Sequence, residues 1–126
     1  MSKILFLCER NAVRSPMAQS LVPGSTSAGL SADSYVDPFA ASILPAIMNH
    51  EPRTVDADDL AAADIVIALS RPAFEAAKEW KNDHSFALEY WELPGIPSHD
   101  GPREIILEGY QAILKALREH LANRGL

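Results

Sequence analysis

The sequence contains a single cysteine, Cys8, among its 126 residues. One cysteine cannot form an intramolecular disulfide, and a zinc site built of cysteines needs several of them. A lone cysteine is most often a buried, apolar side chain. A functional role for Cys8 can therefore be inferred only from the residues that surround it in the sequence.

The chain also lacks long apolar runs. Residues 65–69 form one of the longest, whereas a helix that spans a bilayer needs about 20 apolar residues. The apolar run near the amino terminus, residues 4–7, is followed almost at once by Glu9 and Arg10, so it is too short for the apolar region of a secretory signal peptide. These features predict a cytoplasmic protein with no membrane partner.

Basic residues are few, with 11 Lys and Arg against 17 Asp and Glu and a net charge of −6. Nucleic acids are bound by clusters of Lys and Arg that face the phosphate backbone, and the sequence contains no such cluster. We therefore expect no nucleic-acid partner. The apolar content of 48% is ordinary for a globular protein, and we expect residues 1–126 to form one domain.

Short apolar segments alternate with segments of helical periodicity. Strands are predicted at residues 3–7, 25–30, 64–69 and 86–93. Helices are predicted at about 15–22, 37–48 with a kink at Pro45, 56–63 and 70–80, and after residue 102. Such alternation predicts an α/β fold, a single doubly wound domain with a four-stranded parallel sheet flanked by helices. In such sheets ligands bind at the carboxyl ends of the strands, where Cys8 is expected.

The motif at Cys8 is the most informative part of the sequence. Five residues separate Cys8 from Arg14, and Ser15-Pro16 follows as the predicted N-cap and first residue of a helix. A loop that turns from a strand into a helix points backbone N–H groups inward and binds oxyanions. Arg14 can hold two phosphate oxygens at once, and the same positive field favours the thiolate of Cys8, the nucleophilic form of cysteine.

Residues 5–18, Leu-Phe-Leu-Cys-Glu-Arg-Asn-Ala-Val-Arg-Ser-Pro-Met-Ala, resemble the active-site signature of the low-molecular-weight protein tyrosine phosphatase family. The same fold is shared with thioredoxin-coupled arsenate reductases. Residues 27–29, the strand at 64–69 and the Tyr90-Trp91 pair before a loop rich in Pro and Gly are also similar to the family. The resemblance implies a phosphatase I-like fold and hydrolysis of phosphomonoesters through a cysteinyl-phosphate, without metal or cofactor.

The resemblance also assigns roles to individual residues. Cys8 is the expected nucleophile and Arg14 the expected phosphate clamp. The residues expected to bind the phosphate are Glu9, Arg10, Asn11, Ala12, Val13, Arg14 and Ser15. Those expected to support the loop by hydrogen bonds are Asn11, Ser15, Ser27 and His50, with Asn11 in the left-handed conformation that Asn tolerates. The implied partners are a phosphorylated protein or a small aryl phosphate, and inorganic phosphate or another oxyanion.

The sequence departs from the family at the general acid. In the family this is an aspartate of an Asp-Pro pair, and a gap-free alignment of residues 90–104 places Gly95 and Ile96 there. Asp100, in the same loop, is the predicted substitute, and Glu92 and His99 are weaker candidates. A missing acid predicts slow catalysis.

Three further departures concern the pocket. Arg10 replaces a small residue, and Val13 replaces the cysteine with which many members protect their nucleophile by a reversible disulfide. The aromatic side chains that usually pack against a phosphotyrosine ring are not evident, although Tyr35 and Trp91 are candidates. Three functions stay open: a phosphatase, foremost a tyrosine phosphatase; a phosphate- or phosphoprotein-binding module without turnover; and an arsenate reductase, which would need an external thiol.

Overall fold

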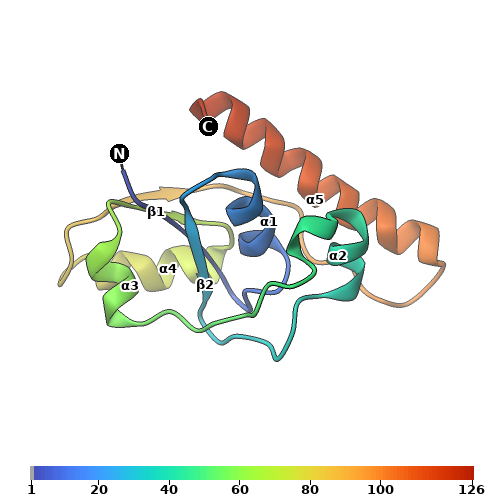
Figure 1. Cartoon of the computed structure of the whole chain (residues 1–126), viewed down its shortest axis with the longest axis horizontal. Coiled ribbons are helices and arrows are strands. Elements are labelled where there is room, and N and C mark those ends of the chain that lie inside the picture. Colours follow the sequence, from blue (N-terminus) through green and yellow to red (C-terminus); the bar gives the residue numbers. More distant parts are fainter. Residues whose placement is uncertain (1) are drawn as a thin grey trace.

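Four short parallel strands form the centre of the computed structural model, which describes residues 2–126 (Figure 1). They are β1 (Ile4–Cys8), β2 (Thr26–Gly29), β3 (Ile65–Ala68) and β4 (Ala87–Tyr90), in the order β2-β1-β3-β4. The chain leaves β1 toward β2 and later returns to add β3 on the other side of β1. The crevice for ligands is expected at this reversal, and Cys8, the last residue of β1, lies beside it. The predicted α/β fold is confirmed.

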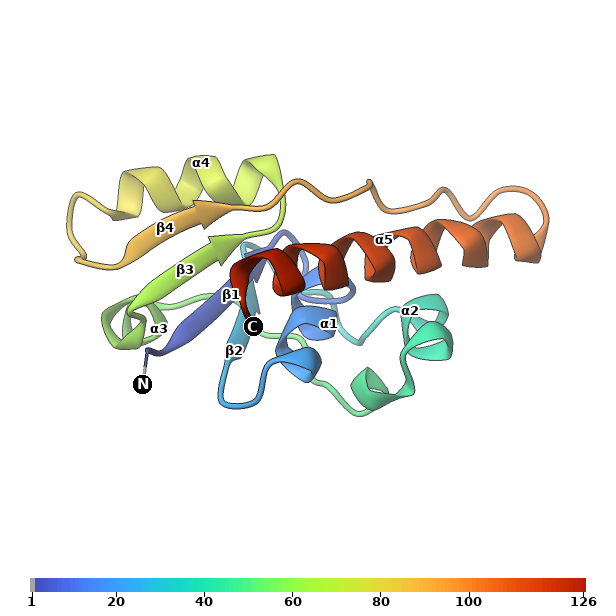
Figure 2. The ribbon, with the colours of Figure 1, turned by 90° about the horizontal axis from the view of Figure 1, so that it is seen from above.

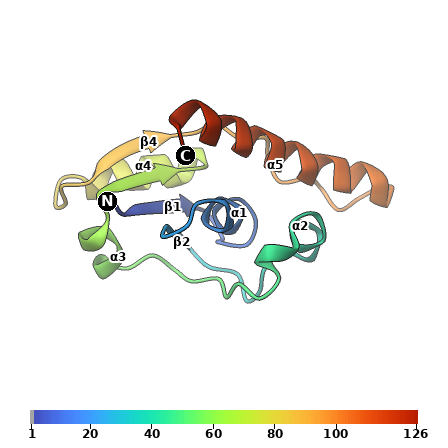
Figure 3. The same ribbon diagram turned by 45° about the horizontal axis from the view of Figure 1, so that its top comes forward.

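Alternation along β1 divides the core into two layers. Ile4, Phe6 and Cys8 face the helices α1 (Arg14–Leu21), α2 (Pro38–Ile43) and α5 (Arg103–Arg124). Leu5 and Leu7 face α3 (Ala57–Ala62) and α4 (Arg71–Trp80) on the other side of the sheet (Figure 2, Figure 3). A strand buried on both faces reads as a continuous apolar run, as residues 4–8 do. No helix within residues 2–126 combines the length and apolar character that crossing a membrane requires.

Three helices begin at the side-chain caps that their sequences predict. Asp37 accepts N–H hydrogen bonds at the start of α2, and Ser70 does so at the start of α4. Asp56 and Asp59 form a reciprocal capping box at α3. The predicted kink at Pro45 is instead a break, because α2 ends at Ile43 and a separate 3₁₀ turn, η1 (Pro45–Ile47), follows. Pro45 has no N–H to continue the helix and disfavours helical backbone before it.

The start of α1 differs from its prediction. The helix begins at Arg14, and its N-cap is Val13, which offers no side-chain hydrogen bond. Ser15, the predicted cap, lies inside the first turn and uses its hydroxyl elsewhere. The N–H groups at the start of α1 therefore have no side-chain cap.

Candidate active site

Backbone hydrogen bonds fix the orientation of the loop between β1 and α1. Four of its carbonyl groups accept N–H donors from residues 30–37, the segment that follows β2, at 2.9–3.0 Å. The pairs are Cys8 with Leu30, Glu9 with Ser31, Arg10 with Asp33, and Ala12 with Asp37. In a trans peptide the N–H points away from the preceding carbonyl. The N–H groups of residues 9, 10, 11 and 13 therefore turn toward the inside of the loop, as an oxyanion site requires.

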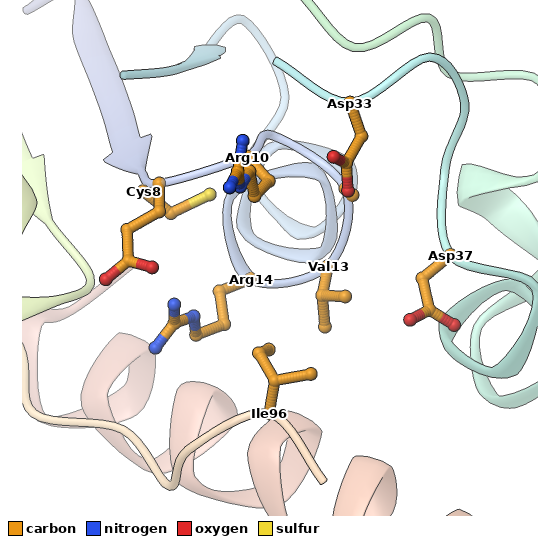
Figure 4. A pocket seen from close by; sticks show the side chains of 9 residues that line it. Cys8, Arg10, Val13, Arg14, Asp33, Asp37 and Ile96 are labelled. Atoms are coloured by element: carbon orange, nitrogen blue, oxygen red, sulfur yellow. The ribbon is translucent and has the colours of Figure 1, made fainter. Parts of the chain in front are cut away.

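A cavity of about 110 Å³ lies on the inner side of this loop. Figure 4 shows the Cys8 sulfur and the Arg14 side chain at this cavity, with Ile96 opposite them. Its lining consists of Cys8, Glu9, Arg10, Ala12, Val13, Arg14, Asp33, Asp37 and Ile96. Five of the seven predicted phosphate-binding residues thus border one small cavity. Asn11 and Ser15 are fully buried beneath it and contribute through backbone and support.

Asn11 is the centre of the network that supports the loop. Its backbone is left-handed, with φ of 54°, and its side chain is fully buried. The amide Nδ2 donates to the hydroxyls of Ser15 and Ser27, at 2.8 and 2.9 Å. Its Oδ1 lies 2.9 Å from His50 Nε2 and accepts the Arg53 backbone N–H at 2.9 Å. An amide oxygen only accepts, so Nε2 of His50 carries the proton. The structure brings all four predicted support residues together.

The same network determines what surrounds the sulfur of Cys8. Ser15 Oγ lies 2.8 Å from Cys8 Sγ, and it already accepts a hydrogen bond from Asn11. The hydroxyl hydrogen of Ser15 is therefore free to point at the sulfur. The Asn11 backbone N–H donates to the same sulfur at 3.3 Å. Two donors aimed at one sulfur stabilise a thiolate, and this use of Ser15 explains why it does not cap α1.

Two residues outside the predicted site also hold the loop. A Cβ on Gly29 would lie 2.8 Å from the Asn11 backbone nitrogen and 2.9 Å from the Glu9 carbonyl oxygen. Only glycine lets the end of β2 pack this closely against the loop. Arg53 donates from its guanidinium to the Ser27 carbonyl at 2.8 Å and pairs with Asp59. The signals available in the sequence were the glycine that ends β2 and the arginine three residues after His50.

Residues 94–102 do not place a carboxylate in the cavity. Asp100, the expected substitute acid, is exposed and accepts the Ser98 hydroxyl at 3.0 Å. Glu92 is exposed too and lies outside the cavity lining. His99 points away to Tyr110, whose hydroxyl lies 2.7 Å from Nε2 and donates to Asp37 Oδ2 at 2.6 Å. The loop is anchored on α5 by this contact, and Asp100 lies outside the cavity lining. Its role as the substitute acid stays a prediction.

Neither aromatic candidate encloses the cavity. Trp91 is buried in the core, with its ring tilted against Phe6 and stacked on His120. Tyr35 is 70% exposed and borders a neighbouring cavity. The wall opposite Cys8 is instead Ile96, an aliphatic side chain from the 94–102 loop.

The support network predicts a pH-dependent stability. Burial, followed by the nearby charge of Arg53, holds the pKa of His50 below 6.5. Between that lowered value and 6.5 the unfolded chain binds more protons than the folded chain, so stability decreases as pH falls below about 6.5. Urea unfolding between pH 5 and 8 should show this decrease in the wild type and a smaller one in His50→Gln, which cannot titrate. His84→Gln, between α4 and β4, is the control and should follow the wild type. Parallel curves for wild type and His50→Gln would contradict the prediction.

The sequence profile described as low molecular weight phosphotyrosine protein phosphatase matches residues 3–93. No curated protein sequence matches the chain. Among solved structures, a mutant of YwlE from Bacillus subtilis superposes with a TM-score of 0.76 at 18% identity, over 100% of both chains.

Two further structures extend the likeness. The tyrosine phosphatase amsI from Erwinia amylovora gives a TM-score of 0.75 at 18% identity, over 98% of this chain and 93% of that chain. The Drosophila arginine phosphatase gives 0.72 at 18% identity, over 98% of both chains. At such identities the superpositions establish the fold, and the profile match, which covers most of the chain, establishes the family. The chain belongs to the low-molecular-weight phosphotyrosine protein phosphatase family.

Proposed function

We propose that this chain is a cysteine-dependent phosphatase in which Cys8 is the nucleophile. The observation that carries the proposal is the sulfur of Cys8, held by two hydrogen-bond donors at a cavity that Arg14 and inward N–H groups surround. The thiolate attacks phosphorus, the bond from phosphorus to the leaving group breaks, and a cysteinyl-phosphate forms. Water then hydrolyses this intermediate, which releases phosphate and restores the thiolate.

Arg14 and the loop supply the electrostatic part of the reaction. The guanidinium can bind two oxygens of the phosphoryl group, and the inward N–H groups can bind the rest. Because these donors are fixed by the bonds to residues 30–37, they need little reorganisation as charge develops in the transition state. Arg10 borders the same cavity and adds a second positive charge near its mouth.

The proposed substrates are phosphorylated protein side chains and small aryl phosphates, with phosphotyrosine foremost by family. Structural neighbours are described as a tyrosine phosphatase and as an arginine phosphatase. We also propose that the chain acts in the cytoplasm, where a free thiol such as Cys8 stays reduced. Hydrolysis of aryl phosphates should be slow, because residues 94–102 supply no carboxylate to protonate the leaving oxygen.

The absent carboxylate also favours a second candidate, a module that binds phosphate or a phosphoprotein without turnover. Such a module would keep the loop and Arg14 and would need no proton donor. The two candidates differ in one observable: a phosphatase releases the dephosphorylated product, whereas a binding module releases none. An arsenate reductase has no support beyond the shared fold, since Cys8 is the chain's one cysteine.

Pre-steady-state kinetics with p-nitrophenyl phosphate test the proposal. This leaving group departs readily as an anion, whereas residues 94–102 supply no carboxylate to act as a base for the attacking water. The cysteinyl-phosphate should therefore form faster than it is hydrolysed. We expect a burst of nitrophenolate that approaches one equivalent per enzyme, followed by slow turnover. The burst should disappear when Cys8 is first alkylated with iodoacetate. Binding of phosphate without any nitrophenolate release would instead establish the binding module.

A further inference from the structure

Gln19, in the last turn of α1, extends the hydrogen-bond network around Cys8 beyond the predicted support residues. Its side-chain oxygen Oε1 accepts the Ser27 hydroxyl at 2.5 Å. Gln19 and Ser15 are four residues apart on α1, so they share the helix face from which both side chains reach the network. Figure 2 shows α1 alongside β2, the strand that carries Ser27. The network thus reaches from the sulfur of Cys8 to the last turn of α1.

The hydrogen bonds of this network run outward from the amide of Asn11. Its Nδ2 donates one hydrogen to Ser15 Oγ and the other to Ser27 Oγ. Ser15 can then donate its own hydrogen to Cys8 Sγ, and Ser27 donates its own to Gln19 Oε1. Two branches therefore start at Asn11. One branch ends at the sulfur, and the other ends at Gln19.

The hydroxyl of Ser27 depends on the acceptor that Gln19 supplies. Ser27 is 2% exposed, so water has little access to its hydroxyl hydrogen. A buried hydroxyl hydrogen without an acceptor is costly. Without the Gln19 oxygen, the hydroxyl would turn toward the Asn11 amide, whose own N–H points at the Ser27 oxygen. Two hydrogens would then oppose each other, and the bond between Asn11 and Ser27 would weaken.

The two branches are coupled because both start at one planar amide group. Asn11 is fully buried, and its backbone is left-handed with φ of 54°. An amide that loses a firm partner at Ser27 can rotate, and this rotation also moves the hydrogen that it donates to Ser15. The hydroxyl of Ser15 is then no longer required to direct its hydrogen at Cys8. Gln19 therefore affects the sulfur through two intervening side chains.

We propose that Gln19 is a positioning residue for the nucleophile: it orients the Ser27 hydroxyl and, through Asn11, keeps the Ser15 hydroxyl directed at Cys8. The role rests on the proposed phosphatase function, because it serves the thiolate. It does not extend to the inward N–H groups that bind phosphate. Those are fixed by backbone hydrogen bonds between the loop carbonyls and residues 30–37, in which no side chain of α1 takes part.

Gln19→Met tests this role, because methionine has a similar length but accepts hydrogen bonds only weakly. Alkylation of Cys8 by iodoacetate, measured between pH 5 and 8, should have its pH profile displaced to higher pH, since the thiolate is less stabilised. For p-nitrophenyl phosphate, kcat/KM should fall about tenfold, the effect of one lost hydrogen bond. The inhibition constant of inorganic phosphate should stay close to the wild-type value. Gln111→Met, at an exposed position on α5, is the matched control and should change none of the three values.

A double-mutant cycle with Ser27→Ala separates orientation of Ser27 from a local effect on packing. In the Ser27→Ala background the hydroxyl that Gln19 orients is gone, so Gln19→Met should cause no further change in alkylation or turnover. Gln19→Ala is a second variant, used in case Gln19→Met does not fold. It removes the acceptor without adding an apolar side chain, and it should displace the alkylation profile in the same direction.

The outcomes distinguish this inference from the function on which it rests. Additive effects in the cycle would overturn the inference, because Gln19 would then act without Ser27. Equal losses of phosphate binding and of turnover would also overturn it, since they would indicate a general loosening of the loop. So would an unchanged alkylation profile in both Gln19 variants. If the wild type releases no nitrophenolate while Gln19→Met still displaces the alkylation profile, the proposed function fails and the role of Gln19 toward the thiolate stands.

Discussion

Replacing Cys8 with serine should abolish hydrolysis of p-nitrophenyl phosphate, with a loss of roughly 10⁴-fold or more in kcat. The serine hydroxyl is not ionised at neutral pH, and the side chain of residue 8 makes no hydrogen bond to a carboxylate or imidazole that could act as a base toward it. Its two neighbours, the Ser15 hydroxyl and the Asn11 backbone N–H, are both arranged to donate to residue 8. Such donors stabilise the negative charge of a thiolate. A neutral serine hydroxyl needs a proton acceptor to become a nucleophile, and these two groups do not provide one.

The same variant should still bind inorganic phosphate. Arg14 and the inward N–H groups remain, and loss of the thiolate charge removes a repulsion against the anion. Titration calorimetry should therefore give an affinity for phosphate that is equal to or higher than that of the wild type. Turnover by Cys8→Ser at a rate near that of the wild type would show that another group is the nucleophile.

Introducing an acid at position 96 should raise the rate on phosphotyrosine about 100-fold, at the lower end of what general acid catalysis contributes. The alignment in sequence points to Gly95, but in the structure the side chain of Ile96 borders the phosphate cavity. A Cβ on Gly95 would meet no atom within 4 Å. Ile96→Asp therefore places a carboxyl group nearer to the leaving oxygen than Gly95→Asp does.

Ile96→Asn is the matched control, because it has nearly the same shape and polarity as aspartic acid but cannot supply a proton. Rates on phosphotyrosine and on p-nitrophenyl phosphate, measured between pH 5 and 8, separate the two effects. Only Ile96→Asp should reduce the difference in rate between phosphotyrosine and p-nitrophenyl phosphate. Its rate advantage over the wild type should decrease as pH rises and the carboxyl group ionises. If Ile96→Asn raised the rate on phosphotyrosine as much as Ile96→Asp does, the gain would come from removing the Ile96 side chain from the cavity and not from a proton donor.

The fold and the centre of the site could be predicted because both depend on local patterns. Apolar runs alternating with helical segments determine the order of the elements, and the Cys8–Arg14 spacing falls directly after β1. The residues of the support network could also be predicted from the family resemblance. Asn11, Ser15, Ser27 and His50 each lie in a short segment of sequence that is similar to the family. These features are encoded within short stretches of the chain.

The remaining features depend on contacts between distant residues. Asp100 is the carboxylate that the sequence offers as an acid, but the contact of His99 with Tyr110 on α5 anchors this end of the loop, and Asp100 lies outside the cavity lining. Gly29 shows no special role until β2 packs against the phosphate loop. Ser15 has the residue type of a helix cap, yet its hydrogen bonds to Cys8 and Asn11 depend on the way the loop curls back on itself, and they override that preference.

The uncapped start of α1 links the fold of this chain to its ligand. The first N–H groups of a helix need acceptors, and at α1 no side chain supplies one. A bound oxyanion would supply it, so the ligand completes the helix in the way that Asp37 and Ser70 complete α2 and α4. Any anion that occupies the loop adds its binding free energy to the stability of the folded state, about 2.7 kcal/mol at one hundred times its dissociation constant. Inorganic phosphate, the product that would compete with substrate, would thus also protect the enzyme from unfolding.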